Sequence, residues 1–327
     1  MKKITVSAPG KLMLFGEHAV IYNHPCLVTA VNQRMYVTIE LLDEHQFQLD
    51  AKDVKIKNYK KQLSELGKGE IPKDAKFAEI AVLNVIARSE EAKQSRVGIK
   101  ITTRSEFSSQ FGFGSSSAIT VCIIKALSEL FSLNLNDKQI FDLSYKTVLE
   151  IQGKGSGFDI ASAIYGGTLY FETAGKTIQL ITNNHLPLIV GYSGIKADTA
   201  TLINRVFNKF TNNKKRLEDL YTETETIVKQ AKQEIENSNW KIVGQLMNRN
   251  QKLLIELGIS TPKLDNMIFA AISHGAYGAK ISGAGGGDCM IALAPADKIK
   301  SAEEAITKAD GKIISIQPNA EGLKNEN

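Results

Sequence analysis

The segment Phe111-Gly112-Phe113-Gly114-Ser115-Ser116-Ser117-Ala118 joins a glycine- and serine-rich turn directly to an apolar helical pattern. Glycines let backbone N–H groups approach an anion, and the first turn of a helix presents unpaired N–H groups and the positive end of its dipole. A serine-capped helix after a flexible turn would explain this segment alone equally well. The phosphate interpretation predicts a binding loop built from Gly112, Gly114, Ser115, Ser116 and Ser117.

A second glycine-rich segment, Ser282-Gly283-Ala284-Gly285-Gly286-Gly287-Asp288, lies between two strand-like runs. A tight hairpin would account for its position. Four glycines in five positions exceed what a turn requires, and each glycine costs conformational entropy on folding. We therefore expect Gly283, Ala284, Gly285 and Gly286 to approach the phosphates of a ligand.

A third segment, residues 7–20, combines a strand, a turn and an apolar run with Lys11, Glu17 and His18. Read alone, it fits an exposed lysine beside a buried, hydrogen-bonded histidine and glutamate. Three ionisable side chains next to two phosphate-type loops favour a functional site instead.

Two other nucleotide motifs are excluded. Gly175-Lys176-Thr177 resembles the end of a P-loop, but Tyr170 occupies the position of its first glycine and no clear helix follows. Ser117 stands where a dinucleotide-binding fingerprint needs its third glycine. Neither a P-loop nor NAD binding is expected.

The composition is that of a globular chain with the length of about two domains: 327 residues, 43% hydrophobic and 23% charged. The net charge of +5 is spread along the chain, which favours a solvated surface over a nucleic-acid-binding one. Cys26, Cys122 and Cys289 are far apart and odd in number, so we expect reduced thiols in a cytosol. No apolar run approaches the ~20 residues that span a bilayer, and no signal peptide is readable.

Helical and strand patterns are mixed without regular alternation, which favours an α+β fold. Strands are expected near 4–6, 35–42, 97–101, 169–171, 186–192, 279–281 and 289–292. Helices are expected near 77–87, 118–130, 141–151, 202–210, 217–235, 242–257 and 264–272. Asn136 with Gln139, and Thr261 with Pro262, predict helix starts. A boundary near residue 184 gives domains 1–184 and 185–327, and the polar tail 317–327 is expected to fray.

The order and spacing of three segments resemble the signature motifs of the GHMP kinases. They are Pro9-Gly10-Lys11 with Gly16-Glu17-His18-Ala19-Val20, the Gly-x-Gly-Ser-Ser loop at 112–116, and the glycine-rich segment 280–287. The first looks most like that of the mevalonate kinases. The resemblance implies a two-domain α+β fold, with an N-terminal domain like domain 2 of ribosomal protein S5 and an α/β-sandwich C-terminal GHMP domain. It also implies ATP and Mg²⁺ bound between the domains.

The same resemblance assigns catalytic roles to two residues. Asp159, at the end of the glycine-rich turn 153–159, matches the catalytic aspartate of the family. A carboxylate there would accept the proton of a substrate hydroxyl while the γ-phosphoryl group of ATP is transferred. Lys11 would favour loss of that proton electrostatically.

For the metal, Ser116 matches the serine that faces Mg²⁺ in the family. Similar mevalonate kinases place a glutamate eleven residues before the catalytic aspartate, but this chain has Val148 there. Glu150 is therefore the candidate carboxylate ligand, since Mg²⁺ prefers oxygen.

Glu17 and His18 resemble the pair that lies near substrate in mevalonate kinases, and Ser193 with Gly194, at the end of a strand, are further candidate contacts. The resemblance predicts phosphorylation of the primary hydroxyl of (R)-mevalonate to 5-phosphomevalonate, with formation of ADP. The segments 155–159 and 285–289 look closer to phosphomevalonate kinases, which leaves phosphomevalonate open as the acceptor. A mevalonate diphosphate decarboxylase and a non-catalytic ligand sensor on this fold are remoter alternatives. The expected protein is cytoplasmic, with no nucleic-acid or membrane partner, and a homodimer is left open.

Overall fold

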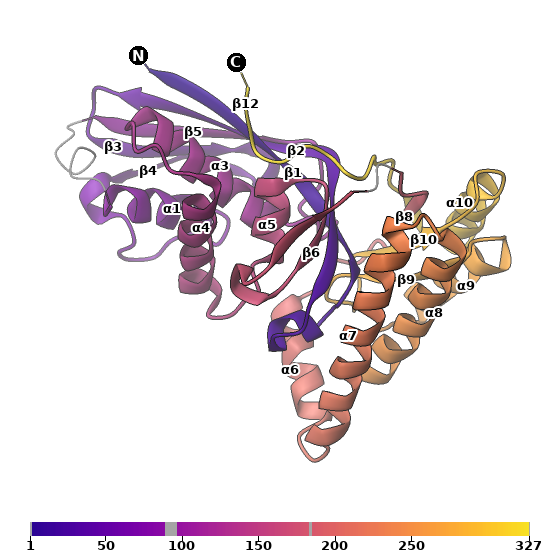
Figure 1. The fold of residues 1–327 in the computed structure, drawn as a ribbon. Helices are drawn as coiled ribbons and strands as arrows, with labels where there is room; N and C mark the ends of the chain where they lie inside the picture. Colours follow the sequence, from indigo (N-terminus) through magenta and orange to yellow (C-terminus); the bar gives the residue numbers. More distant parts are fainter. Residues whose placement is uncertain (1, 89–96, 183–184, 327) are drawn as a thin grey trace.

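The computed structural model describes residues 2–88, 97–182 and 185–326, and these form two lobes, each with its own sheet (Figure 1). The N-terminal lobe contains an eight-stranded sheet in which β12-β1-β2-β5-β3-β4 are consecutive neighbours, while β6 pairs with β2 and β7 with β6. Its strands are β1 (Lys3–Phe15), β2 (Cys26–Leu42), β3 (Gln46–Ala51), β4 (Ile56–Gln62), β5 (Gly98–Ser105), β6 (Thr168–Phe171), β7 (Ile178–Ile181) and β12 (Lys324–Glu326). The C-terminal lobe contains a four-stranded sheet with the order β11-β8-β10-β9. Its strands are β8 (Leu188–Tyr192), β9 (Gly278–Ser282), β10 (Cys289–Leu293) and β11 (Lys312–Ile313).

Helices pack against each sheet, so the α+β class is confirmed for the described residues. In the N-terminal lobe they are α1 (Lys76–Ile86), α3 (Ser115–Leu130), α4 (Asp137–Gln152) and α5 (Phe158–Tyr165). In the C-terminal lobe they are α6 (Thr199–Lys209), α7 (Lys214–Glu236), α8 (Trp240–Leu257), α9 (Pro262–Ser273) and α10 (Ile299–Lys308). Both predicted helix starts are confirmed: Asn136 and Gln139 form a capping box at α4, and Thr261 caps α9 with Pro262 in its first turn.

Strand β1 is longer than the sequence pattern predicts. A turn is expected at Pro9 and Gly10, but β1 continues through them to Phe15, antiparallel to β2. The register shifts between the two residues, so that Pro9 lies opposite Arg34 and Gly10 opposite Val31. A bulge of this kind accommodates a proline that has no N–H to donate. The continuation keeps Lys11 on the strand and in the middle of the molecule.

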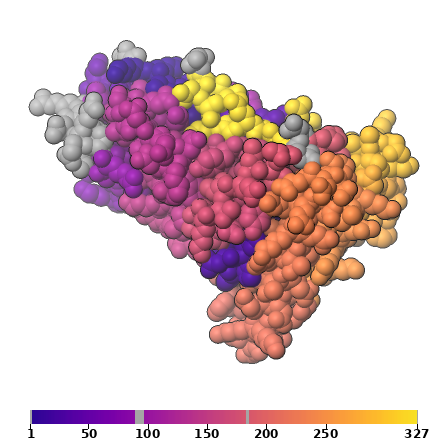
Figure 2. Space-filling view, in the orientation of Figure 1, coloured from indigo at the N-terminus to yellow at the C-terminus, as the bar shows by residue number. Residues whose placement is uncertain are grey.

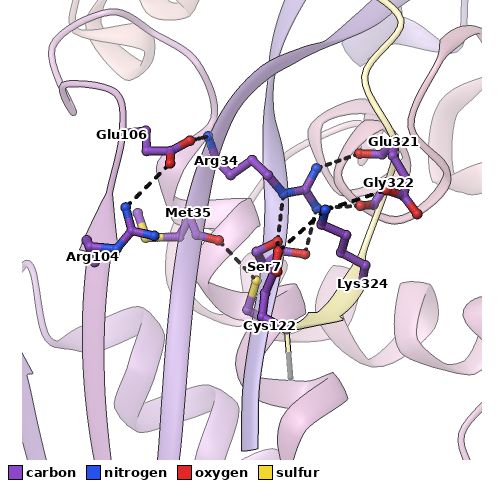
Figure 3. Close-up of polar contacts among 10 residues, drawn as sticks. Ser7, Arg34, Met35, Arg104, Glu106, Cys122, Glu321, Gly322 and Lys324 are labelled. Atoms are coloured by element: carbon purple, nitrogen blue, oxygen red, sulfur yellow. Dashed lines mark hydrogen bonds and ion pairs between the residues drawn. The ribbon is translucent and has the colours of Figure 1, made fainter.

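The predicted fraying of the tail is wrong. The last strand, β12, pairs antiparallel with β1, for example Thr5 with Glu326. The buried guanidinium of Arg34 donates to the carbonyl oxygens of Glu321 at 2.8 Å and Gly322 at 2.6 Å, and its Nε donates to Ser7 Oγ at 2.6 Å (Figure 3). No local pattern in the sequence indicates this, because Arg34 binds backbone carbonyls and the tail's own side-chain contacts, such as Ser7 Oγ donating to Glu326, join residues far apart in the chain. In Figure 2 the tail, in yellow, lies across the surface of the N-terminal lobe.

Replacing Arg34 should loosen this tail. Arg34→Met leaves two carbonyls of the tail without their charged donor, and we expect the free energy of unfolding to fall by about 2–4 kcal/mol. Amide hydrogen exchange of residues 320–326 should rise in the same variant. The matched control is Arg104→Met, because Arg104 is 61% exposed and pairs with Glu106 at 3.4 Å. Its cost should stay below ~1 kcal/mol. Equal losses in both variants would contradict the proposed hold on the tail.

Three further expectations concern the cysteines, membrane-spanning helices and the domain boundary. Cys26, Cys122 and Cys289 are buried and free, as expected of reduced thiols. Among the described residues, no helix combines the length and apolarity needed to cross a membrane. The expected domain boundary at residue 184 lies outside the described residues, and the division at that point stays a prediction.

Candidate active site

A cavity of about 310 Å³ is lined by residues of both lobes. This volume lies at the lower end of the usual range for small-molecule sites. Eleven of the residues predicted from the sequence line it: Lys11, Glu17, His18, Gly112, Gly114, Ser115, Ser116, Ser117, Asp159, Gly283 and Ala284. Since they come from four distant segments of the chain, the fold brings together what the three motifs and the Asp159 turn suggested separately.

Lys11 and Asp159 form an ion pair in this cavity. Lys11 extends from β1, and its Nζ lies 3.1 Å from Asp159 Oδ1 and donates to the carbonyl oxygen of Gly112 at 2.8 Å. Asp159 lies in the first turn of α5, where the helix dipole favours a negative charge. Gly114 allows this close approach, because a Cβ atom there would lie 3.3 Å from Lys11 Cε.

The phosphate-type loop has the geometry that its sequence predicts. Gly112 and Gly114 adopt left-handed conformations, with φ of 73° and 78°, and α3 begins at Ser115. Ser115, Ser116 and Ser117 therefore occupy the first turn of a 16-residue helix whose start faces the cavity. Unpaired N–H groups and hydroxyls at this end can bind phosphate oxygens.

The second glycine-rich loop connects β9 to β10, two paired strands, so it is both a hairpin connection and part of the cavity wall. Its glycines have different roles. Gly283, with φ of 99°, has open space where a Cβ would lie, whereas Gly285 approaches the Ile259 backbone and Gly286 packs against Leu202. Gly285 and Gly286 do not line the cavity, and their contact with phosphates stays a prediction. Their small size is needed for packing.

Glu17 and His18 connect the two lobes at the cavity wall. The carboxylate of Glu17 pairs with the Lys280 ammonium, and both side chains are fully buried. Burial raises the pKa of Glu17 and lowers the pKa of Lys280, while their mutual attraction opposes both shifts. The sequence analysis placed Glu17 at the substrate but did not identify Lys280, on β9, as its partner.

His18 binds the other glycine-rich loop. Its Nε2 lies 2.9 Å from the Ala284 carbonyl oxygen, and since a carbonyl only accepts, Nε2 must carry the proton. Burial lowers the pKa of His18, which favours the neutral ring at neutral pH. Its buried Nδ1 has no hydrogen-bond partner in the described part of the chain, and is therefore an available acceptor at the cavity wall.

Glu150 is not at the cavity. Its carboxylate accepts a hydrogen bond from Asn84 Nδ2 at 3.1 Å, whereas Val148 and Gln152 are the α4 side chains that line the cavity. Residues two apart on a helix point in widely different directions, which explains why Glu150 lies away from the cavity that Val148 and Gln152 line. Ser116 lines the cavity and Glu150 does not, while among the described residues of α4 the polar side chain at the cavity is the amide of Gln152.

Ser193 and Gly194 also lie outside the cavity lining. The Ser193 hydroxyl is used within its own turn, donating to the Ile195 carbonyl at 3.3 Å and accepting from the Ile195 N–H at 3.2 Å. The residues that reach the cavity come directly after this turn: Lys196, Ala197 and Thr199. The predicted segment therefore adjoins the cavity, and a substrate contact by Ser193 or Gly194 stays a prediction.

Asp288 is a cavity residue that the sequence analysis quoted without assigning a role. It is buried, adopts a left-handed conformation with φ of 52°, and accepts a hydrogen bond from Ala197 N–H at 2.9 Å. Its Oδ2 lies so close to Gly112 that a Cβ there would be 2.6 Å away. Burial raises the pKa of Asp288, and the charges of Lys11 and Lys196 oppose that shift. In the sequence, its place as a charged residue directly after a run of glycines was the feature that could have identified it as a site residue.

Family models match three parts of the chain. The GHMP kinases N terminal domain matches residues 79–167, and the GHMP kinases C terminal model matches residues 231–312. A galactokinase galactose-binding signature matches residues 1–41, which include Lys11, Glu17 and His18.

Curated relatives match over nearly the whole length. A mevalonate kinase from Pyrococcus furiosus is 35% identical over 99% of this chain and 98% of its own. One from Thermococcus onnurineus is also 35% identical, with the same coverage.

Solved structures give the same picture. The Methanococcus jannaschii mevalonate kinase has a TM-score of 0.82 and 29% identity, covering 97% of this chain and 98% of its own. The L. major mevalonate kinase in complex with R-mevalonate has a TM-score of 0.77 and 25% identity, covering 98% and 97%. A Streptococcus pneumoniae phosphomevalonate kinase also has a TM-score of 0.77, covering 97% and 100%, but at 18% identity it supports the fold alone.

Proposed function

The chain belongs to the GHMP kinases, within the mevalonate kinases, and we propose that it transfers the γ-phosphoryl group of ATP to the primary hydroxyl of (R)-mevalonate. The observation that carries this proposal is the 3.1 Å contact between Lys11 Nζ and Asp159 Oδ1 beside the start of α3. A base and a cation are thereby held where a hydroxyl and a phosphate can meet.

In the proposed reaction, α3 and the 112–117 loop bind the phosphates of ATP through N–H and hydroxyl donors. Asp159 orients the acceptor hydroxyl and accepts its proton as the phosphoryl group is transferred. Lys11 stabilises the developing alkoxide and the transferring group, because its ammonium is held against both Asp159 and the Gly112 carbonyl. Glu17 acts through Lys280 and positions the loop that carries Ala284.

We propose that Mg²⁺ accompanies ATP. When bound, the ion neutralises charge on the phosphate oxygens. The Ser116 hydroxyl is the protein ligand that fits, with phosphate oxygens and water supplying the remaining oxygens that Mg²⁺ prefers. We place the reaction in the cytoplasm, where buried free thiols such as Cys26 stay reduced.

Mevalonate is favoured over phosphomevalonate as the acceptor by the relatives, which are mevalonate kinases at 35% identity over the full chain. The phosphomevalonate kinase named above shares 18%. His18 supports the same choice, because its free Nδ1 is a neutral acceptor suited to a hydroxyl donor rather than to a phosphate dianion.

A coupled ADP-release assay tests the proposal with four acceptors in parallel: mevalonate, 5-phosphomevalonate, galactose and homoserine. We expect turnover with mevalonate at kcat/KM at least about 100-fold above the other three, since the missing hydrogen bonds or added charge of a wrong acceptor each cost several kcal/mol. A preference for 5-phosphomevalonate would show that the chain acts as a phosphomevalonate kinase instead. Absence of ADP release with every acceptor would contradict the enzyme and favour a ligand sensor.

A further inference from the structure

Within the described residues that line the cavity, most charged side chains are already paired or have a proposed role. Lys11 contacts Asp159 and the Gly112 carbonyl, and Glu17 is paired with the buried Lys280. His18 is favoured in its neutral form. The cationic side chains left for a ligand are Lys154, in the turn before α5, and Lys196, in the turn before α6.

Mevalonate carries one charge of its own, a carboxylate at the end opposite its primary hydroxyl. A buried or half-buried carboxylate needs a cation or several hydrogen-bond donors. The proposed mechanism uses Lys11, Asp159 and the phosphate loop at the hydroxyl end. It assigns nothing to the carboxylate end.

Lys196 belongs to a segment that is fixed on both sides. Ser193 N–H donates to the Asp288 carbonyl at 2.9 Å, Asp288 N–H donates to the Ile195 carbonyl at 2.7 Å, and Ala197 N–H donates to Asp288 Oδ1 at 2.9 Å. Gly287 permits this contact, since a Cβ there would lie 2.5 Å from the Ile195 carbonyl oxygen. Asp198 then caps α6 through Ala200 N–H. The backbone that presents Lys196 is thus held before any ligand arrives.

The position of Asp288 separates Lys196 from the phosphate loop. Its carboxylate lies with Oδ1 on Ala197 and Oδ2 against Gly112, between the two segments. A negative group there disfavours contact between the triphosphate and the 195–197 backbone. Lys196 acts on Asp288 through its charge, without an ion pair within 4.0 Å among the described residues, so the N–H groups of its ammonium stay available to a ligand in the cavity.

We infer that Lys196 binds the carboxylate of the acceptor, and that Asp288 is the positioning residue that holds the segment carrying it. This inference rests on the proposed function and adds the residue that binds the carboxylate end of the substrate. Lys154, from the N-terminal lobe, then contacts solvent or the nucleotide.

The test combines a charge change in the protein with a charge change in the acceptor. Wild type, Lys196→Met and Lys154→Met are each assayed with mevalonate and with 3-methylpentane-1,3,5-triol, which keeps the primary and tertiary hydroxyls but lacks the carboxylate. For Lys196→Met we expect kcat/KM with mevalonate to fall about 10- to 100-fold, mainly through KM. With the triol, kcat/KM should stay within about twofold of wild type. Lys154→Met should change kcat/KM by the same factor with both acceptors.

Asp288 is tested by the same ratio of kcat/KM values. Asp288→Gly tolerates the left-handed backbone but removes the acceptor for Ala197 N–H, so it should lower the mevalonate-to-triol ratio about fivefold or more. Asp288→Asn keeps an oxygen for that N–H and should restore most of the ratio. If Asp288 had a purely structural role, kcat/KM would fall by the same factor with mevalonate and with the triol in both variants.

The outcomes separate this inference from the function on which it rests. Failure of wild type to phosphorylate mevalonate overturns the proposed function. If wild type is active, an unchanged ratio in Lys196→Met overturns the inference alone. A ratio that falls in Lys154→Met instead would assign the carboxylate to Lys154 and also overturn it.

Discussion

Asp159→Asn is expected to lower kcat about 10³-fold, which is within the range for loss of a positioned general base. The carboxylate contacts Lys11 at 3.1 Å and is one-third exposed, so it can meet both the cation and a substrate hydroxyl. An asparagine keeps the size of the side chain but accepts no proton at neutral pH. We propose that the 112–117 loop binds the phosphates without help from Asp159, so the affinity for ATP should stay within about threefold of wild type.

The control for this variant is Asp142→Asn. Asp142 lies on α4, is half exposed and pairs with Lys138, away from the cavity lining. Its kcat should match wild type, and the thermal midpoints of both variants should differ little. Turnover of Asp159→Asn within tenfold of wild type would remove Asp159 from the role of base.

Lys280→Met should be the most destabilising substitution considered. It leaves the Glu17 carboxylate without its cation in a fully buried position, and breaking such a pair costs about 3–5 kcal/mol. Denaturant unfolding measures this as a lower midpoint at an unchanged slope. Activity should fall as well, because Glu17 and Ala284 border the same cavity.

Adding Glu17→Gln to Lys280→Met removes the uncompensated charge, and should recover about 1–3 kcal/mol of the loss. The surface pair Lys138 and Asp142, with side chains 58% and 50% exposed, supplies the control. Lys138→Met should cost no more than ~0.5 kcal/mol. A double variant less stable than Lys280→Met would show that Glu17 needs no cation.

Sequence reasoning located most of the candidate site because its motifs depend on local backbone geometry. Glycines at 112 and 114 and the serines after them specify a turn and a helix start wherever they occur. Lys11 and Asp159 came from resemblance, and the fold brings them to 3.1 Å. The pairing of Glu17 with Lys280 depends on contacts across 263 positions, which no local pattern contains.

Where the structure places residues differently from the expectation, the difference has a physical cause. Glu150 was chosen as the nearest carboxylate in sequence, but helix phase turns it toward Asn84. Gly285 and Gly286 share the composition of a phosphate loop, yet their missing side chains serve packing against Ile259 and Leu202. A glycine-rich composition indicates that another group comes close to the backbone, but it does not show whether that group is a ligand or another part of the protein. The tail was misjudged for a related reason, since Arg34 binds its carbonyls rather than its side chains.

The pairing of β12 with β1 has a consequence for synthesis. Thr5 faces Glu326, so after Thr5 is made a growing chain must add 321 residues to complete its partner. At about 5–20 residues per second, this takes roughly 16–64 s. Throughout that interval the edge of β1 at residues 5–7 lacks its neighbour, and an open strand edge invites pairing with other chains. The N-terminal lobe can therefore reach its final form only after residues 324–326 have been synthesised and have left the ribosome, and every ribosomal pause before residue 324 prolongs the exposure.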